Sequence, residues 1–361
     1  MMAQQQRLHP MTATYDIAQS YQFNYDRGPV FDSAAKPVAA GPWKEFLGRK
    51  VRSRLGISAG LLLNSKWILG YAQHGFDILT YKTVRSAARA CYPPPNWVFI
   101  EEDGSKDGPV YVATRWPEEA TQISSAVCFG MPSMAPEVWR EDVSRARAGL
   151  AEGQMLIVSV VATPKDGATA GEVAADFAQC ARWAAEAGAD AIEANFSCPN
   201  VCSAEGTIYM DVELSRQIAT DLRTALGSTP LLIKIGHFKD PTGLRTFLRV
   251  MDGLVHGVVT VNAISRPVLH RDGRPAFGKT FVKAGVLGRA LHEPSVENVR
   301  EAAAIVKADG LRLTIVAVGG VSRAEDAQDF FNAGAEAVLM GSSPMYLPNL
   351  AAEIKQAHPE W

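Results

Sequence analysis

The stretch that decides the fold is LTIVAVGGVSRAEDAQDFFNAGAEAVLMGSS, residues 313–343. It contains two short apolar runs, each followed by glycine, with a helical segment between them. Both runs are continuously apolar rather than alternating, which is typical of parallel strands buried on both faces. The stretch therefore predicts one unit of an alternating β/α fold.

The same rhythm extends back through the chain. Six further apolar runs precede this stretch: GISAG (56–60), DILTYK (77–82), MLIVSVV (155–161), ADAIEANF (189–196), PLLIKIG (230–236) and HGVVTVNA (256–263). Amphipathic helical segments such as residues 171–188 separate the runs. Eight strands alternating with helices predict an α/β protein with a (β/α)8 TIM barrel. A doubly wound open sheet is the alternative.

Three further regions complete the predicted organisation. We expect residues 1–50, which lack clean periodicity, to form an N-terminal arm that packs on a barrel formed by residues 51–361. Residues 84–135 and 264–292 are too long for ordinary loops. They predict insertions at the C-terminal face of the strands, where barrels build their active sites.

Composition narrows the class of protein. The chain has 361 residues, with 36 Lys+Arg against 38 Asp+Glu. No basic excess exists to neutralise a phosphate backbone, so we expect no nucleic-acid partner. Five cysteines without a CxxC pair indicate reduced thiols in a cytoplasmic protein. Because no uncharged apolar stretch reaches about 18 residues and no secretory signal opens the chain, we expect no membrane insertion.

Glycine turns follow the last two predicted strands. Gly319 and Gly320 follow the first, and Gly341 and Ser342 follow the second. Glycines let backbone N–H groups approach an anion closely, and barrels often bind phosphate after strands seven and eight. Ser322 and Glu325 have the spacing of a capping box, which would begin a helix at this site. The alternative is that the glycines simply end the strands.

Polar residues interrupt the apolar strands at four places. Lys82 and Lys234 lie near the ends of strands, where a lysine needs an anionic partner or keeps its ammonium group in solvent. We interpret them as two cations at the barrel mouth. Asn195 and Asn262 end strands four and six, and their amides would suit a planar heterocycle with donors and acceptors. Each could instead bond only its local turn.

The strongest local signal is NFSCPN, residues 195–200, which places Cys198 between asparagines after an apolar strand. A thiol there would act as a nucleophile or as a general acid/base, or it would be a buried inert cysteine. No other ligands occur at metal-binding spacing, so we expect no metal.

These residues together resemble the dihydroorotate dehydrogenase family, FMN-dependent (β/α)8 barrels related to the pyrimidine-reducing domain of dihydropyrimidine dehydrogenase. The matching segments lie in family order over roughly residues 50–350: GISAG (56–60), TYKT (80–83), NFSCPN (195–200), LLIKIG (231–236), VNAI (261–264), GVLGRAL (285–291), AVGGVSRAEDA (317–327) and VLMGSS (338–343).

The resemblance implies a role for each matching residue. Those implied to hold FMN are Ala59, Gly60, Lys82, Lys234, Asn262, Gly288, Gly319, Gly320, Gly341 and Ser342. Those implied to bind the substrate ring are Asn195, Asn200 and Asn262. Cys198 would be the catalytic base, Lys82 would contact both FMN and substrate, and Lys234 would stabilise charge on the reduced flavin.

The implied reaction is oxidation of a CH–CH bond in dihydroorotate or a related dihydropyrimidine-like ring, with hydride passing to flavin N5 and a proton to cysteine. The chain departs from the family pattern at Val127, where an asparagine is usual, and at Ala263, where serine or threonine is usual. Two polar contacts to a pyrimidine acid are therefore missing.

The resemblance leaves the electron acceptor open between a soluble oxidant and a separate reductase, and it favours a homodimer. Two other functions compete with this one. They are a non-catalytic flavin-binding barrel, and a phosphate-binding lyase or isomerase barrel that uses Lys234 as a Schiff-base amine.

Overall fold

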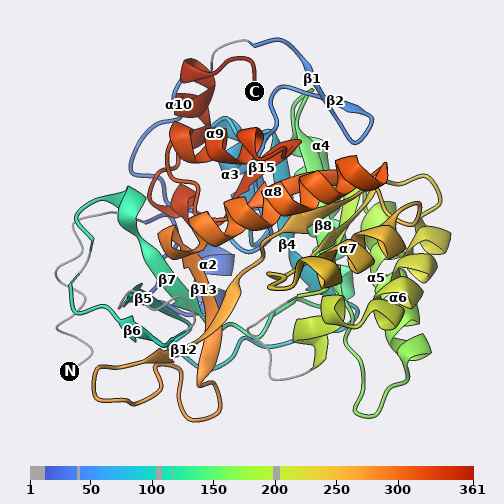
Figure 1. The fold of residues 1–361 in the computed structure, drawn as a ribbon. Helices are drawn as coiled ribbons and strands as arrows, with labels where there is room; N and C mark the ends of the chain where they lie inside the picture. The colour runs from blue at the N-terminus through green and yellow to red at the C-terminus, as the bar shows by residue number, and fades with distance from the viewer. Residues whose placement is uncertain (1–12, 39–40, 103–107, 116, 198–203) are drawn as a thin grey trace.

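Eight parallel strands close into a barrel in the computed structural model, which describes residues 13–38, 41–102, 108–115, 117–197 and 204–361 (Figure 1). Around the barrel the strands are β3 (Leu55–Ile57), β4 (Ile78–Arg85), β8 (Met155–Val161), β9 (Ala191–Asn195), β10 (Leu231–Lys234), β11 (Gly257–Thr260), β14 (Thr314–Val318) and β15 (Ala337–Met340). Each lies within or overlaps one of the predicted apolar runs, so the predicted (β/α)8 barrel is confirmed.

A helix follows each barrel strand before the next begins. These are α3 (Ser65–Gln73), α4 (Pro136–Gly149), α5 (Ala170–Glu186), α6 (Val212–Leu226), α7 (Pro241–Met251), α8 (His292–Asp309), α9 (Ala324–Asn332) and α10 (Leu350–Ala357). In α5 the local sequence explains both ends. Thr169 and Glu172 form a capping box at its start, and Gly188 adopts a φ of 104° just past its end.

Strand β8 shows why the barrel strands are apolar throughout. All of its residues are buried. Met155 and Ile157 belong to an apolar cluster inside the barrel, whereas Leu156 and Val158 pack in the larger cluster between strands and helices. Because successive side chains point to opposite faces, both faces must be apolar when both are covered.

The two predicted insertions pair with each other. β5 (Trp97–Glu101), β6 (Val110–Val112) and β7 (Ser124–Val127) come from the first, and β12 (Ile264–Leu269) and β13 (Lys283–Gly288) from the second. They close into a second, five-stranded barrel beside the main one (Figure 1). The sequence predicted the insertions but not this pairing, which joins Val127 to Gly285 across the chain.

The N-terminal region contacts both ends of the main barrel. In α2 (Tyr21–Arg27), the Tyr25 carbonyl accepts a hydrogen bond of 2.7 Å from Asn64 at the start of α3. The hairpin of β1 (Lys44–Phe46) and β2 (Arg49–Val51) adds Phe46 and Val51 to the apolar cluster inside the barrel. The predicted arm boundary after residue 50 therefore falls within β2.

Four short 3₁₀ turns complete the elements: η1 (Ala120–Gln122), η2 (Ala204–Met210), η3 (Arg289–Leu291) and η4 (Ser343–Met345). Within the residues described above, no helix combines the length and the hydropathy required to cross a membrane.

Candidate active site

A cavity opens at the carboxyl ends of the barrel strands. It measures roughly 1360 Å³ when the part open to solvent is included. Its lining comes from the arm, from the segments that follow β3, β11, β14 and β15, from residues of β4, β9, β10 and β14, and from the two insertions. In (β/α)8 barrels this face carries the active site, so the cavity is the candidate site here.

The cavity gathers the predicted site residues that the structure describes. Those lining it are Ala59, Gly60, Lys82, Asn195, Lys234, Asn262, Gly288, Gly319, Gly320, Gly341 and Ser342. Cys198 and Asn200 lie outside the described residues.

Lys234 is the most deeply buried cation of the site. It ends β10 at 2 % exposure, and its Nζ donates a 2.5 Å hydrogen bond to Ser58 Oγ. Its Nζ also lies 3.9 Å from Oε1 of Glu193, a fully buried side chain on β9. A buried carboxylate is costly unless a positive charge compensates it, and Lys234 places its amino group where it can do so, beside the cavity.

Lys82 reaches the cavity because β4 is irregular. The prediction placed Lys82 at the end of its strand, but β4 continues to Arg85 and its pairing with β8 shifts register between Tyr81 and Val84. This bulge lets two consecutive residues, Lys82 and Thr83, both face the cavity. The Lys82 ammonium lies 5.9 Å from the centre of the Tyr21 ring on the arm.

Asn195 and Asn262 meet at one side of the cavity. Nδ2 of Asn262 lies 3.3 Å from Oδ1 of Asn195 and also donates to the carbonyl of Ser197. The Asn195 Oδ1 accepts a further bond of 3.2 Å from Ser197 N–H. The two predicted amides therefore form one network, and it leads directly to the segment that contains Cys198.

The glycines at the site serve two different physical purposes. A Cβ built on Gly60 or Gly341 would meet nothing within 4 Å, so at these positions the missing side chain leaves room in the cavity. A Cβ on Gly319 would lie 2.2 Å from Ser295 Oγ, and one on Gly320 would lie 2.6 Å from the Gly288 carbonyl. These two glycines are required because the turn packs directly on neighbouring segments.

The predicted capping box after this turn is wrong. Helix α9 begins at Ala324 with Arg323 as its N-cap, and no side chain caps it. Ser322 N–H instead donates to Asp326 Oδ2 at 2.9 Å, and Arg289 donates to Asp326 Oδ1 at 2.8 Å. The turn is therefore anchored by a buried aspartate one residue later than the motif predicts.

Charge holds Asp326 in its ionised form. Burial alone would raise the pKa of Asp326, but the Ser322 N–H and the nearby charges of His292 and Arg289 outweigh burial and lower it. The carboxylate therefore remains available to fix the turn around neutral pH.

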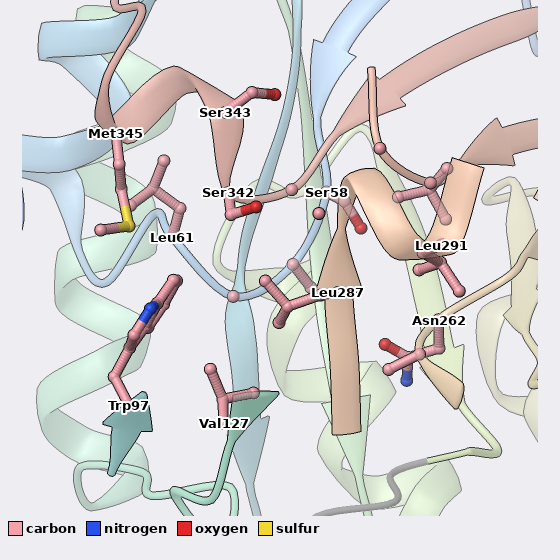
Figure 2. A pocket seen from close by; sticks show the side chains of 18 of the residues that line it. Ser58, Leu61, Trp97, Val127, Asn262, Leu287, Leu291, Ser342, Ser343 and Met345 are labelled. Atoms are coloured by element: carbon pink, nitrogen blue, oxygen red, sulfur yellow. The ribbon is translucent and has the colours of Figure 1, made fainter. Parts of the chain in front are cut away.

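The residues at this cavity fit a flavin mononucleotide. Gly60 and Gly341 leave a cradle that any Cβ would fill, and Gly320 and Ser342 place backbone and hydroxyl donors beside it. Lys234 and Arg289 supply positive charge. Figure 2 shows Ser342 and Ser343 across the cavity from the apolar Trp97 and Val127, so the lining suits a ligand with an anionic end and a flat ring.

The sequence analysis did not predict several of the residues that line the cavity. They include Ser58, the arm residues Tyr15 and Tyr21, and Trp97, Phe129 and Met131 of the first insertion. Ser58 lies within a quoted strand motif and differs from its apolar neighbours, so its polarity was an available signal. The arm and insertion residues carry no such signal, because only the tertiary fold brings them to the cavity.

The two departures from the family pattern both face the cavity. Val127 is buried at the end of β7, and Ala263 follows β11. An apolar side chain and a methyl group therefore stand where polar contacts were expected.

None of the described cysteines takes part in the site. Cys91, Cys128 and Cys180 are absent from the cavity lining. Burial raises the pKa of Cys91 to about 11, although Lys82 opposes the shift. Burial also raises the pKa of Cys180. These two remain neutral thiols near neutral pH.

A (β/α)8 barrel whose strand ends surround a buried lysine and a glycine-lined cavity is typical of an enzyme. Comparison with known proteins gives the family. The sequence model of the dihydroorotate dehydrogenase family matches residues 125–359. A dihydroorotate dehydrogenase of Dictyostelium discoideum is 32% identical over 354 residues, covering 93% of this chain and 95% of that protein.

Two further relatives agree. The catalytic subunit of a dihydroorotate dehydrogenase B (NAD(+)) from a Thermoanaerobacter species is 29% identical, over 51% of this chain and 59% of its own. A crystal structure of an Eimeria tenella dihydroorotate dehydrogenase in complex with ferulenol has the same fold, with a TM-score of 0.67. The two sequences are 19% identical, and the match covers 87% of this chain and 82% of that one. The chain belongs to the dihydroorotate dehydrogenase family of flavin-dependent oxidoreductases.

Proposed function

We propose that this enzyme uses FMN to oxidise a CH–CH bond of dihydroorotate or of a closely related dihydropyrimidine-like ring. The observation that carries the proposal is the convergence of Lys234, the glycine turns and the paired asparagines on one cavity at the strand ends. A flavin bound there supplies the acceptor for the hydride that leaves one of two adjacent carbons.

The chain's own residues provide the remaining chemistry. Gly288, Gly319, Gly320, Gly341 and Ser342 would hold the phosphate of FMN, and Ala59 and Gly60 would contact its ring. Lys234 keeps a positive charge at the ring, because Glu193 and Ser58 fix its ammonium group. Placing that charge before the reaction favours a state in which negative charge develops beside it.

The amides and Lys82 bind the substrate. Asn195 and Asn262, together with Asn200, offer both donors and acceptors to the edges of a planar ring. Lys82 supplies positive charge between the arm and the cavity, which suits an acidic substituent on that ring.

Cys198 accepts the proton. The three described cysteines do not line the cavity, whereas Ser197 and its amide network lead directly into the segment that carries Cys198. The thiolate of Cys198 would remove a proton from the carbon next to the one that loses hydride.

The reaction and the family resemblance together suggest the partners. We infer a small heterocyclic substrate, a homodimer, and re-oxidation by either a soluble oxidant or a separate reductase. A cytoplasmic location agrees with the reduced cysteines that the composition indicates.

Anaerobic flavin bleaching tests the proposal. The purified protein, reconstituted with FMN, should be yellow and should lose its colour when dihydroorotate or dihydrouracil is added without oxygen. We expect several cyclic amides, tested as a panel, to bleach the flavin at different rates. Val127 and Ala263 lack the polar groups that would restrict the reaction to a single substrate.

The same experiment separates the alternatives. A protein that binds FMN but is bleached by no cyclic amide would favour the non-catalytic flavin barrel. Borohydride trapping of a carbonyl compound on Lys234 would favour a lyase. The ion pair with Glu193 argues against that use, because a Schiff base requires the neutral amine.

A further inference from the structure

His292, at the start of α8, lies directly behind the turn formed by Gly319 and Gly320. Its side chain is buried and does not line the cavity. The ideal Cβ of Gly320 would lie 2.9 Å from the His292 Cβ, so no other side chain separates the histidine from the turn. The position of His292 is therefore set by the close approach of α8 to this turn.

Both ring nitrogens of His292 face hydrogen-bond acceptors. Nδ1 lies 3.1 Å from the Gly319 carbonyl oxygen, and Nε2 lies 3.1 Å from Oδ2 of Asp329 on α9. The Asp326 carboxylate adds a second negative charge 3.8 Å from Nε2. Since a carbonyl oxygen can only accept, Nδ1 is the donor in its hydrogen bond to Gly319.

The bond to Gly319 fixes the orientation of one peptide plane. The Gly319–Gly320 peptide is not among the cis bonds of the chain, so the Gly320 N–H points opposite to the Gly319 carbonyl. The carbonyl points at His292, on the side away from the cavity. The N–H of Gly320, a residue that lines the cavity, therefore points to the side of the peptide opposite His292.

The orientation of this peptide needs a fixed contact because both of its residues are glycines. Gly319 has a φ of +152° and Gly320 a φ of +65°, conformations that glycine adopts readily. Because neither residue has a side chain, little restricts rotation of the peptide between them. A flipped peptide would present a carbonyl oxygen to a phosphate instead of a donor. The hydrogen bond from His292 to the Gly319 carbonyl opposes that flip, because a flipped peptide would lose it.

We propose that His292 is a positioning residue for the cofactor phosphate, which holds the Gly319–Gly320 peptide so that its N–H faces the anion. This inference rests on the proposed binding of FMN at the same turn. It predicts that His292 contributes to the affinity for the phosphate group and not to the affinity for the flavin ring.

Two uncharged variants separate the contacts of His292. His292→Asn keeps a side-chain N–H close to the position of Nδ1, and so keeps a donor for Gly319. His292→Gln places its amide near the position of Nε2 and keeps only the contact with Asp329. The matched control is His74→Gln, because His74 is equally buried, at 4 % exposure, and its Nδ1 bonds the Gly70 carbonyl at 2.8 Å away from the cavity.

The assay titrates apoprotein with FMN and with riboflavin, which lacks the phosphate, and follows quenching of flavin fluorescence. We expect His292→Gln to raise the Kd for FMN about tenfold, the loss expected for one hydrogen bond, and to change the Kd for riboflavin less than about twofold. His292→Asn should stay within about threefold of the wild type for both ligands, and His74→Gln should match the wild type.

Three results would overturn the inference. One is an equal loss of FMN and riboflavin affinity in His292→Gln, because His292 would then have no particular effect on the phosphate. Another is unchanged FMN affinity in that variant while the wild type binds FMN. The third is a His292→Asn variant as weak as His292→Gln. A wild-type protein that binds neither flavin would instead overturn the proposed function, and this inference with it.

Discussion

Replacing Lys234 with methionine will destabilise the protein because it leaves the charge of Glu193 buried without a counter-ion. The two side chains are 2 % and 0 % exposed, and their charged atoms lie 3.9 Å apart. At this distance two unit charges attract by about 4 kcal/mol at an effective dielectric constant of 20. Removing one partner of a buried pair typically costs about 3–5 kcal/mol, so we expect the free energy of unfolding to fall by that amount.

A double-mutant cycle measures the pair itself. Urea denaturation of the apoprotein, followed by circular dichroism, gives the free energy of unfolding for the wild type, Lys234→Met, Glu193→Gln and the double variant. The double variant should lose less than the sum of the single variants, by about 1–3 kcal/mol. Lys36 and Glu353 form the control pair, at 2.7 Å but with side chains 54 % and 48 % exposed, and their coupling should stay below about 1 kcal/mol.

Two results would refute this reasoning. Additive effects of Lys234→Met and Glu193→Gln would mean that the two charges do not compensate one another. A loss below about 1 kcal/mol for Lys234→Met would mean that the Glu193 charge is stabilised without the lysine. Either result would remove the argument that Lys234 is held charged beside the cofactor.

Three further predictions concern the cavity and its turn. Cys198→Ala should bind FMN normally but slow anaerobic flavin reduction roughly 10²–10⁴-fold in stopped-flow measurements, whereas unchanged rates would exclude it as the base. Gly341→Val should keep the wild-type melting temperature yet lose at least about tenfold in FMN affinity, because its Cβ enters open cavity space. The control is Gly171→Val, in the exposed first turn of α5, which should keep both the melting temperature and the FMN affinity of the wild type. The lowered pKa of Asp326 means that its ionised form stabilises the fold above its usual pKa and that this contribution disappears as pH falls through the lowered value. Acid titration of unfolding should therefore show a shallower loss in Asp326→Asn than in the wild type, and parallel curves would contradict the assignment.

The barrel could be predicted from the sequence because its strands are buried on both faces. Every residue of β8 is buried, so the strand reads as one apolar run and stands out from its surroundings. The same background makes Lys234 conspicuous, because an ammonium group within such a strand needs a partner. Its partner Glu193 also lies within a quoted strand, but the sequence cannot tell which of the many acidic residues faces which lysine.

The remainder of the site depends on contacts between distant segments. The pairing of β7 with β13 brings Val127 and Leu287 to one wall of the cavity, yet either strand alone is too short and irregular to indicate a partner. The arm brings Tyr21 over Lys82. The bulge in β4 that turns both Lys82 and Thr83 inward is likewise a property of pairing and not of local propensity.

The glycines show most clearly where sequence reasoning stops. Gly319 and Gly341 look equivalent in the sequence, since each follows an apolar strand at the C-terminal end of the chain. In the fold, a Cβ at Gly319 would collide with Ser295, whereas a Cβ at Gly341 would enter the cavity. Substitution at Gly319 must therefore disturb packing along with any ligand, and substitution at Gly341 disturbs the ligand alone. Only the second kind of glycine can report on cofactor binding without a change in stability, which is why Gly341 and not Gly319 is the position to mutate.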